Sequence, residues 1–264
     1  MKKYLRVLSN TWEEMVTYRL NFVMWRVRTV LQFLTMYFLW LALIPKGTIL
    51  FGYSQTLMLT YILGTSILSA VVLSTRTHEI GEHIYRGDLS IFLIRPINYF
   101  LYWFSRDVGD KLFNISFSVV EIMILLFLLK PPIFLQTEII FIALAILATA
   151  LAVVLYFLFG AILGMLGFWS PDVWAPRFIL FILLQFFAGS LFPLDILPKS
   201  LYEAFQLTPF PYLLYFPLKI YLGQLPFSTI STGFLIDVIW ILIIALFLQF
   251  IWHKGLRLYT AVGR

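Results

Sequence analysis

Long apolar runs, separated by short polar or proline-containing breaks, dominate the pattern of this chain. An α-helix rises about 1.5 Å per residue, so roughly 20 apolar residues cross the ~30 Å hydrocarbon core of a bilayer. Six runs approach or exceed that length, at residues 29–44, 55–74, 112–129, 139–168, 175–191 and 233–252. The first run is short, but Trp25, Arg26 and Arg28 can extend it to the headgroups. The pattern predicts an all-α membrane protein in which residues 1–264 form one domain with six spans.

The first 28 residues follow a different periodicity. Leu5, Leu8, Trp12 and Met15 recur at helical spacing, and charged residues fall largely between them. A basic amphipathic helix of this kind lies in the membrane interface with its apolar face down. We therefore expect residues 1–28 to form an interfacial helix, and the alternative is a short cytoplasmic tail with a chance pattern.

Residues 193–223 are apolar and aromatic but are interrupted by proline. The five prolines are Pro193, Pro198, Pro209, Pro211 and Pro217. Because proline removes a backbone donor and obstructs helix continuation, one continuous span is not expected here. The pattern instead predicts two short helices, at about 199–207 and 212–222, that form a re-entrant hairpin in the outer leaflet between the fifth and sixth spans.

Composition agrees with this hydrophobic pattern. The chain is 61% hydrophobic and 12% charged, with a mean hydropathy of +0.93, whereas a soluble domain is about 45–50% apolar. The sequence has no cysteine, which excludes disulfides and thiolate metal sites.

The basic residues are distributed unevenly between the two sides that six spans define. Of the 19 Lys and Arg residues, 4 fall on one side, namely Lys46, Lys130, Lys199 and Lys219. The other 15 fall on the side of the termini, namely Lys2, Lys3, Arg6, Arg19, Arg26, Arg28, Arg76, Arg86, Arg95, Arg106, Lys111, Arg177, Lys254, Arg257 and Arg264. The positive-inside rule therefore predicts that both termini and residues 76–96 are cytoplasmic.

Residues 76–96, RTHEIGEHIYRGDLSIFLIRP, form a densely charged stretch between the second and third spans. Acids and bases alternate there with apolar residues, and the pattern predicts a short helix that ends at Gly87, followed by Asp88 as the cap of a second helix. This stretch is either a docking helix for a cytoplasmic subunit or a solvated connection.

The loop YRGDLSIFLIRPIN, together with the six spans and the proline-rich hairpin, resembles the permease subunits of ABC-2 type transporters. The pattern R-G-x-L-x-x-x-L-x-R-P is present at Arg86, Gly87, Leu89, Leu93, Arg95 and Pro96. The resemblance implies a coupling helix that sits in a groove of an ATP-hydrolysing subunit. The residues implied to contact that subunit are Glu79, Glu82, Ile84, Tyr85, Arg86, Gly87, Asp88, Leu89 and Arg95.

The sequence contains no G-x-x-x-x-G-K-[ST] phosphate-binding loop. The resemblance therefore implies that this chain is not an enzyme and that a separate partner binds ATP and Mg²⁺. Two ATPase subunits and a second permease, identical or homologous, would complete an exporter in the bacterial inner membrane.

Two carboxylates and three glycines lie inside the predicted spans. Glu121 is near the middle of the third span, where a charge is costly, so it faces a translocation path, a permease interface or a neighbouring helix. Asp237 lies near the outer end of the last span, where it can reach water, and a role in the path or interface is the alternative. Gly160, Gly164 and Gly167 share one side of the fourth helix and are predicted to permit close helix packing.

Other classes of protein have less support. His78 and His83 are five residues apart, so they do not form H-E-x-x-H, and no metal site is predicted. The basic residues follow topology rather than a nucleic-acid groove. An ATP-independent channel or secondary transporter remains the alternative function, although the paired intramembrane charges and internal repeats typical of that class are not evident. The paired catalytic groups of an intramembrane enzyme are not evident either.

Overall fold

The computed structural model describes residues 2–17 and 19–259, and nearly all of this part of the chain is helical. The α-helices are α1 (Lys2–Thr17), α2 (Arg19–Leu43), α3 (Gln55–Leu68), α4 (His78–Tyr85), α5 (Leu89–Leu93), α6 (Tyr99–Leu129), α7 (Ile139–Met165), α8 (Trp174–Phe187), α9 (Lys199–Gln206), α10 (Tyr215–Tyr221) and α11 (Phe227–Leu256). The shorter elements are the π-helical turn η1 (Ser69–Leu73) and the 3₁₀ turns η2 (Leu166–Phe168), η3 (Leu194–Ile196) and η4 (Phe210–Tyr212). The strands β1 (Ile49–Leu50) and β2 (Tyr53–Ser54) form a small antiparallel hairpin.

Within the described residues, four helical stretches are long and apolar enough to cross a membrane. They are Gln55–Tyr85, Tyr99–Leu129, Ile139–Phe168 and Phe227–Leu256. These contain the second, third, fourth and sixth predicted spans. Helix α2, which contains the first predicted span, is 25 residues long, but Arg26, Arg28 and Gln32 lower its hydropathy. Helix α8, which lies in the fifth predicted span, has only 14 residues.

Three helix boundaries differ from the sequence prediction. The interfacial helix ends at Thr17 rather than at residue 28, because residues 19–28 continue into α2. Helix α8 ends at Phe187 rather than at residue 191, because Gly189 adopts a positive φ of 80° just beyond the cap residue Ala188. Helix α6 begins at Tyr99 rather than at residue 112, where the third predicted span starts, so that it has 31 residues.

The long helix α6 begins and ends at recognisable caps. The Asn98 side chain accepts a 3.0 Å hydrogen bond from the Leu101 amide, and Lys130 closes the helix with a left-handed φ of 44° before Pro131. Gly109, in its first half, does not break the helix. A Cβ at Gly109 would lie 3.2 Å from the Leu8 carbonyl oxygen, so the glycine permits α1 to cross α6 at close range.

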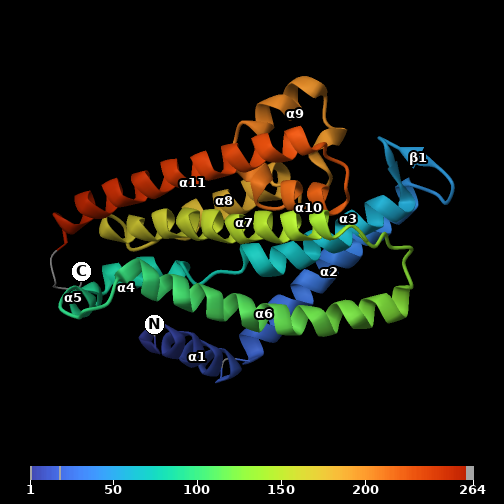
Figure 1. The fold of residues 1–264 in the computed structure, drawn as a ribbon. Coiled ribbons are helices and arrows are strands. Elements are labelled where there is room, and N and C mark those ends of the chain that lie inside the picture. The colour runs from blue at the N-terminus through green and yellow to red at the C-terminus, as the bar shows by residue number, and fades with distance from the viewer. Residues whose placement is uncertain (1, 18, 260–264) are drawn as a thin grey trace.

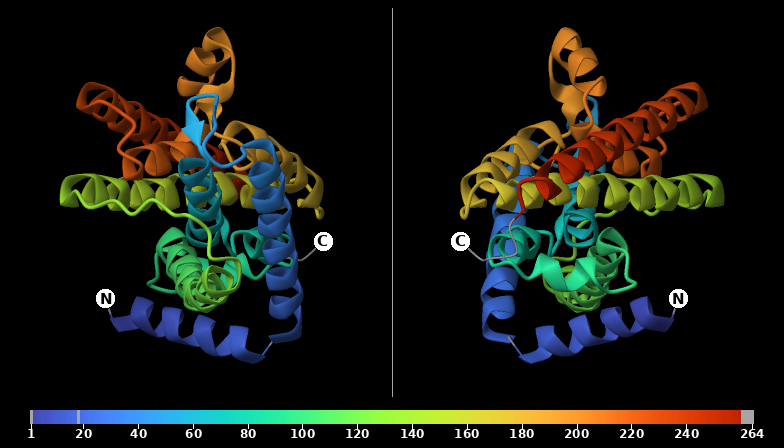
Figure 2. Two further views of the ribbon diagram at one scale, coloured as in Figure 1. Left: turned by 90° about the vertical axis from the view of Figure 1, so that its right-hand side faces the viewer. Right: turned by 90° about the vertical axis from the view of Figure 1, so that its left-hand side faces the viewer.

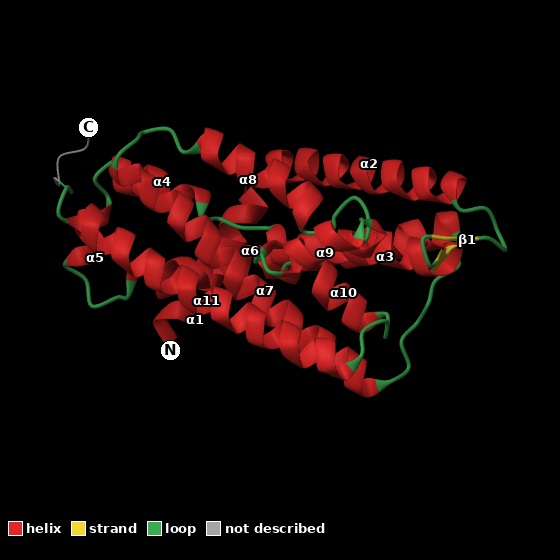
Figure 3. Cartoon of the chain, turned by 90° about the horizontal axis from the view of Figure 1, so that it is seen from above, coloured by secondary structure: helices red, strands yellow, loops and turns green. Residues whose placement is uncertain are grey.

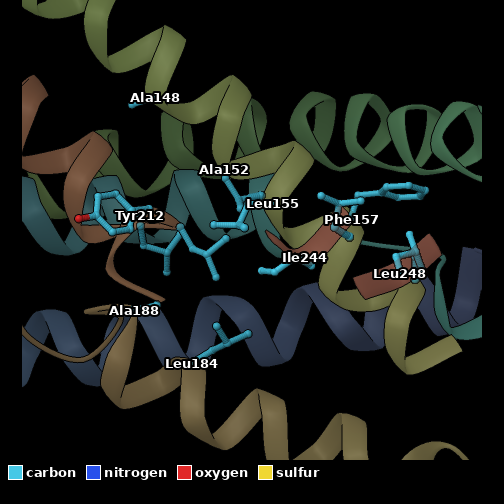
Figure 4. Close-up of a cluster of buried hydrophobic side chains, with 14 of the residues drawn as sticks. Ala148, Ala152, Leu155, Phe157, Leu184, Ala188, Tyr212, Ile244 and Leu248 are labelled. Atoms are coloured by element: carbon cyan, nitrogen blue, oxygen red, sulfur yellow. The ribbon is translucent and has the colours of Figure 1, made fainter. Parts of the chain in front are cut away.

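Helix α7 is the centre of the bundle. It packs against α11, α10 and α4, and Figure 1 shows it running beside α11 along the length of the molecule. Its small residues Ala148 and Ala152 and its Leu155 belong to one buried cluster with Tyr212, Leu184 and Ile244, which come from three other elements (Figure 4). Small side chains on α7 therefore allow several helices to approach it closely.

The two ends of the molecule carry different elements. Helices α4 and α5 lie at the same end as the described C-terminal residues, and the β1–β2 hairpin lies at the opposite end (Figure 1). Seen from above, α2 and α8 lie along one edge, whereas α11 lies along the other (Figure 3). Helix α1 runs steeply across the direction of α2 (Figure 2).

The proline-rich segment contains two short helices, as predicted, at α9 and α10. The two differ in environment. Every residue from Pro211 to Ile220 is buried, whereas α9 has no buried residue and projects from the bundle (Figure 1). Irregular backbone around η4 is thus covered by protein, which is the condition for its survival at membrane depth.

Candidate functional site

The segment between the π-helical turn and α6, residues 76–96, contains α4 and α5 and is called the loop segment below. Gly87 ends α4 with a positive φ of 86°, which agrees with the predicted helix stop. Asp88 occupies the N-cap position of α5, as predicted, although its side chain makes no cap hydrogen bond. The Tyr259 hydroxyl instead stabilises this turn, because it donates to the Gly87 carbonyl at 2.5 Å and accepts from the Ser90 amide at 3.0 Å.

The inner face of the loop segment packs directly on α7. Ile80, Ile84 and Leu89 have 0%, 2% and 0% exposure. A Cβ at Gly164 would lie 2.7 Å from the Ile80 Cβ, one at Gly160 would clash with Thr77, and one at Gly167 would clash with the backbone of Gly81. The three glycines therefore form the seat of α4, and the element that approaches them closely is α4 with its N-cap residue Thr77.

Buried polar contacts fasten the beginning of the loop segment. Lys111 of α6 donates to the Val72 carbonyl at 3.0 Å and to the Ser74 carbonyl, and it pairs with Asp107 at 3.1 Å. Thr75 donates to the other Asp107 oxygen at 2.5 Å. These groups satisfy the carbonyls that the π-helical turn leaves free at its end, so the connection from α3 to α4 is anchored on α6.

A charged network joins α1, α4 and α6. Glu14 of α1 lies 3.0 Å from Arg76 and 2.7 Å from Arg106, and Glu79 of α4 lies 3.1 Å from Arg76 and 3.0 Å from Arg106. Asp110 lies 4.0 Å from Arg76. Because Glu14 and Glu79 each contact both arginines, a movement of α4 would be transmitted to α1 and to α6.

The outer face of the loop segment is exposed and combines charge with large apolar side chains. Besides His78 and Pro96, the exposed residues of the loop segment form one set that we call the outer face, namely Glu82, Arg86, Asp88, Ile91, Leu93, Ile94 and Arg95. Glu82 and Arg86 form only an exposed 3.3 Å pair, which adds little to stability. Ile94 is 85% exposed. Exposed apolar residues beside exposed charges are typical of a surface that meets another protein.

A second site is the ion pair between α2 and α6. Arg26 donates through Nε to the Glu121 Oε1 at 2.7 Å and through Nη2 to the other carboxylate oxygen, in a bidentate arrangement. The same Nη2 donates to the Ser118 hydroxyl at 2.9 Å. Of the three surroundings predicted for Glu121, the structure shows a contact with a neighbouring helix, and the pair shields a charge that lipid would disfavour.

Comparison with known families explains this combination of spanning helices and a buttressed loop. A family model described as ABC-2 family transporter protein matches residues 30–263. The chain belongs to this family. No curated protein matches it. The chain is therefore a multi-pass membrane component of the ABC-2 type, a class that generally works with ATPase subunits in ABC transporters.

The residues that the ABC-2 resemblance implied as ATPase contacts separate into two groups. Glu82, Arg86, Asp88 and Arg95 belong to the outer face. The others are turned partly or fully inward: Glu79 and Tyr85 are half-buried, whereas Ile84, Gly87 and Leu89 are buried in the chain and do not present a surface to a partner here. The last three support the outer face from behind.

Asp237 is placed differently from the prediction. It is fully buried in the chain, so the expectation that it reaches water is wrong, and neither a translocation path nor a permease interface is open to it in this structure. The sequence suggested water because Asp237 is near the outer end of its span, but the proline-rich segment covers this end of α11.

A cluster on the side opposite the loop segment was missed by sequence reasoning. Buried Lys219 donates to Asp195 at 2.8 Å, to the Tyr53 hydroxyl at 2.8 Å and to the Gln224 side chain at 2.5 Å. Burial lowers the pKa of Lys219, and burial together with the Asp195 charge raises the pKa of Tyr53. The cluster ties the proline-rich segment to the β1–β2 hairpin. Its signal in the sequence was the pair of opposite charges, Asp195 and Lys219, within an apolar stretch.

The two histidines of the loop segment have structural surroundings. His78 contacts the Thr75 carbonyl at 3.2 Å, and His83 lies against the rings of Phe92 and Trp103, at centroid distances of 4.9 and 5.6 Å. Across residues 2–17 and 19–259, no three acidic or histidine side chains are grouped so as to hold a metal ion.

Proposed function

We propose that this chain is the permease subunit of an ATP-driven exporter and that its loop segment is the coupling element. The observation that carries the proposal is the two-sided construction of that segment. Its inner face is seated on Gly160 and Gly164 of α7 and on Gly167 of η2, and its outer face is exposed. A rigid element that contacts a spanning helix on one side and a partner on the other can transmit the partner's movement to the membrane.

The partner that fits the outer face is a cytoplasmic ATPase subunit. The face offers acids (Glu82, Asp88), bases (Arg86, Arg95) and an exposed apolar side chain (Ile94). This combination suits a protein groove better than lipid or water. The sequence contains no phosphate-binding loop, so we assign ATP and Mg²⁺ to two separate ATPase subunits and no enzymatic activity to this chain.

The topology that we propose has six spans and two cytoplasmic termini in the bacterial inner membrane. Helices α2 and α8 would be the remaining two spans, in addition to the four long apolar stretches. They would cross the membrane packed within protein rather than as isolated helices exposed to lipid. Among the basic residues that support this orientation, Arg264 and the side chains of Lys2 and Arg19 lie outside the described residues. Helix α1 would lie in the inner interface, and the proline-rich segment would re-enter from the outer side, where α10 is buried.

A second permease, identical or homologous, is proposed to cover the edge formed by α2 and α8. Arg28, Gln32 and Thr35 are exposed at helical spacing on α2, and Gln32 donates to Gln185 of α8 at 3.1 Å. A polar stripe of this kind is costly against hydrocarbon. It is accommodated if the edge faces another permease or a water-filled path between the two copies.

Reversing two charges on the outer face should detach the ATPase. We expect the double substitution Arg86→Glu and Arg95→Glu to weaken binding of a co-expressed ABC ATPase about tenfold or more, because two favourable contacts become repulsive. Co-purification and transport into inverted vesicles measure this. Lys46→Glu, an exposed reversal on the opposite side of the molecule, is the matched control. Unchanged binding in the double variant, or transport without any ATPase, would refute the proposal in favour of an ATP-independent transporter.

A further inference from the structure

Asp237 is a buried carboxylic acid that the coupling mechanism does not use. It is 0% exposed, and neither of its carboxylate oxygens has a hydrogen-bond partner among the described residues. Its surroundings therefore differ from those of Glu121, whose carboxylate accepts hydrogen bonds from Arg26, which also donates to Ser118.

The groups that cover Asp237 come from the proline-rich segment. Gly233, Asp237 and Trp240 share one face of α11, because they are separated by four and three residues. On either side of Asp237, a Cβ at Gly233 would clash with the Phe216 ring, and the Trp240 Nε1 donates to the Leu207 carbonyl at 3.0 Å. Residues 207–216 thus lie over Asp237, and we call them the cover segment.

The cover segment brings no charge that could balance an ionised Asp237. Its titratable residues are Tyr212, whose hydroxyl donates to the Gln206 carbonyl at 2.8 Å, and Tyr215. The nearest cation along the chain is Lys219, which Asp195 engages at 2.8 Å.

The other elements around α11 are equally poor in cations. Helix α7, which packs along α11, has no Asp, Glu, Lys, Arg or His and only Tyr156 as a titratable group. On α11 itself, His253 and Lys254 are about four turns away, at the opposite end. Gln206, next to the cover segment, has a buried side-chain nitrogen that also lacks a partner within the described residues.

An ionised carboxylate in these surroundings would cost several kcal/mol, and protonation removes that cost. We propose that Asp237 is a proton-binding site that reports the position of the cover segment. The acid is neutral while the cover segment lies over it. When the segment lifts, the Oδ–H bond breaks, the proton passes to water and the carboxylate is hydrated. The proposal stands independently of any ATPase partner.

The direction of the pH dependence follows from proton counting. The covered state binds one proton more than the open state, so a rise in pH favours opening. Over the range in which only the covered state holds the proton, the opening constant should increase about tenfold per pH unit. Low pH therefore holds the cover segment closed.

The test uses the full chain in lipid nanodiscs. Infrared spectra of wild type and Asp237→Asn at neutral pH should differ by one protonated carboxylic acid C=O band. Asp195→Asn, a matched amide variant in the proline-rich segment outside residues 207–216, should retain this band. Hydrogen exchange of residues 207–216, divided by the intrinsic rate, should rise between roughly pH 6 and 9 in wild type and stay flat in Asp237→Asn.

Two results would overturn the proposal. One is that the infrared spectra at neutral pH contain no carboxylic acid band that disappears in Asp237→Asn. That result would show that the Asp237 carboxylate is ionised. The other is the same pH slope of exchange in wild type and Asp237→Asn. If the asparagine variant does not fold, wild type alone decides, because its acid band must fade with rising pH in step with the exchange of residues 207–216.

Discussion

Alanine at Gly167 should unseat α4 and uncouple the loop segment from the membrane helices. The new Cβ would collide with the Gly81 carbonyl oxygen and would lie 2.8 Å from the Gly81 Cα. Because these are backbone atoms, they cannot rotate away as a side chain could. We expect a loss of stability of at least ~1–3 kcal/mol, the usual cost of overpacking, and loss of ATPase-dependent transport. Gly160→Ala should be milder, because the atoms it meets belong to the side chain of Thr77.

Thermal unfolding of the full chain and transport in reconstituted vesicles measure this effect. Ala150→Val is the matched control, since it adds bulk to an exposed position of α7, the helix that η2 continues, and should change stability by no more than ~0.5 kcal/mol. If Gly167→Ala melts and transports like wild type, α4 is not seated on α7 in the way described here.

Separating Arg26 from Glu121 should be the other strongly destabilising change. Their side chains are 11% and 23% exposed, so removal of one partner strands a largely buried charge. Full burial would cost roughly 3–5 kcal/mol, and the residual exposure lowers our expectation to about 2–4 kcal/mol for Arg26→Met or Glu121→Met. The double variant should recover much of the loss, because neither charge is then left unpaired.

A double-mutant cycle on unfolding free energy isolates this pair. The control cycle is Lys199→Met with Glu203→Met, an exposed i,i+4 pair at 3.8 Å on α9, for which we expect a coupling of only about 0.3–0.5 kcal/mol. A coupling for Arg26 and Glu121 no larger than that of the control would contradict the bidentate pair in the structure.

The long apolar spans were predictable from the sequence because burial in lipid depends mainly on local composition. The spans of α6, α7 and α11 depend on uninterrupted apolar length, and the structure contains them. Boundaries were less predictable where one residue decides them. Gly189 ends α8 through a positive φ that the surrounding apolar pattern conceals.

The pairings inside the candidate site could not be predicted, because they join residues far apart in the chain. Arg26 and Glu121 are separated by 95 positions, and Arg26 had a sufficient local explanation as a headgroup anchor. The inward face of α4 left a clearer signal. Ile80 and Ile84 are one turn apart, which marks one side of a short helix for burial and leaves Glu82 and Arg86 outside.

Gly160, Gly164 and Gly167 show what can and what cannot be predicted from the sequence. Their spacing predicts a surface for close packing, but it does not say which element occupies that surface. The structure places α4 there, and this placement converts a packing feature into a link between the loop segment and the bundle.

The central claim is that the outer face of the loop segment contacts a separate ATPase, and site-directed photo-crosslinking tests it most directly. A photoreactive residue at Ile94, which is 85% exposed, would be compared in membranes with one at Leu246, which is 66% exposed on α11. The account predicts a cross-link to the co-expressed ATPase from position 94 and none from position 246. No cross-link from position 94 in a complex that still transports, or equal cross-links from both positions, would contradict it.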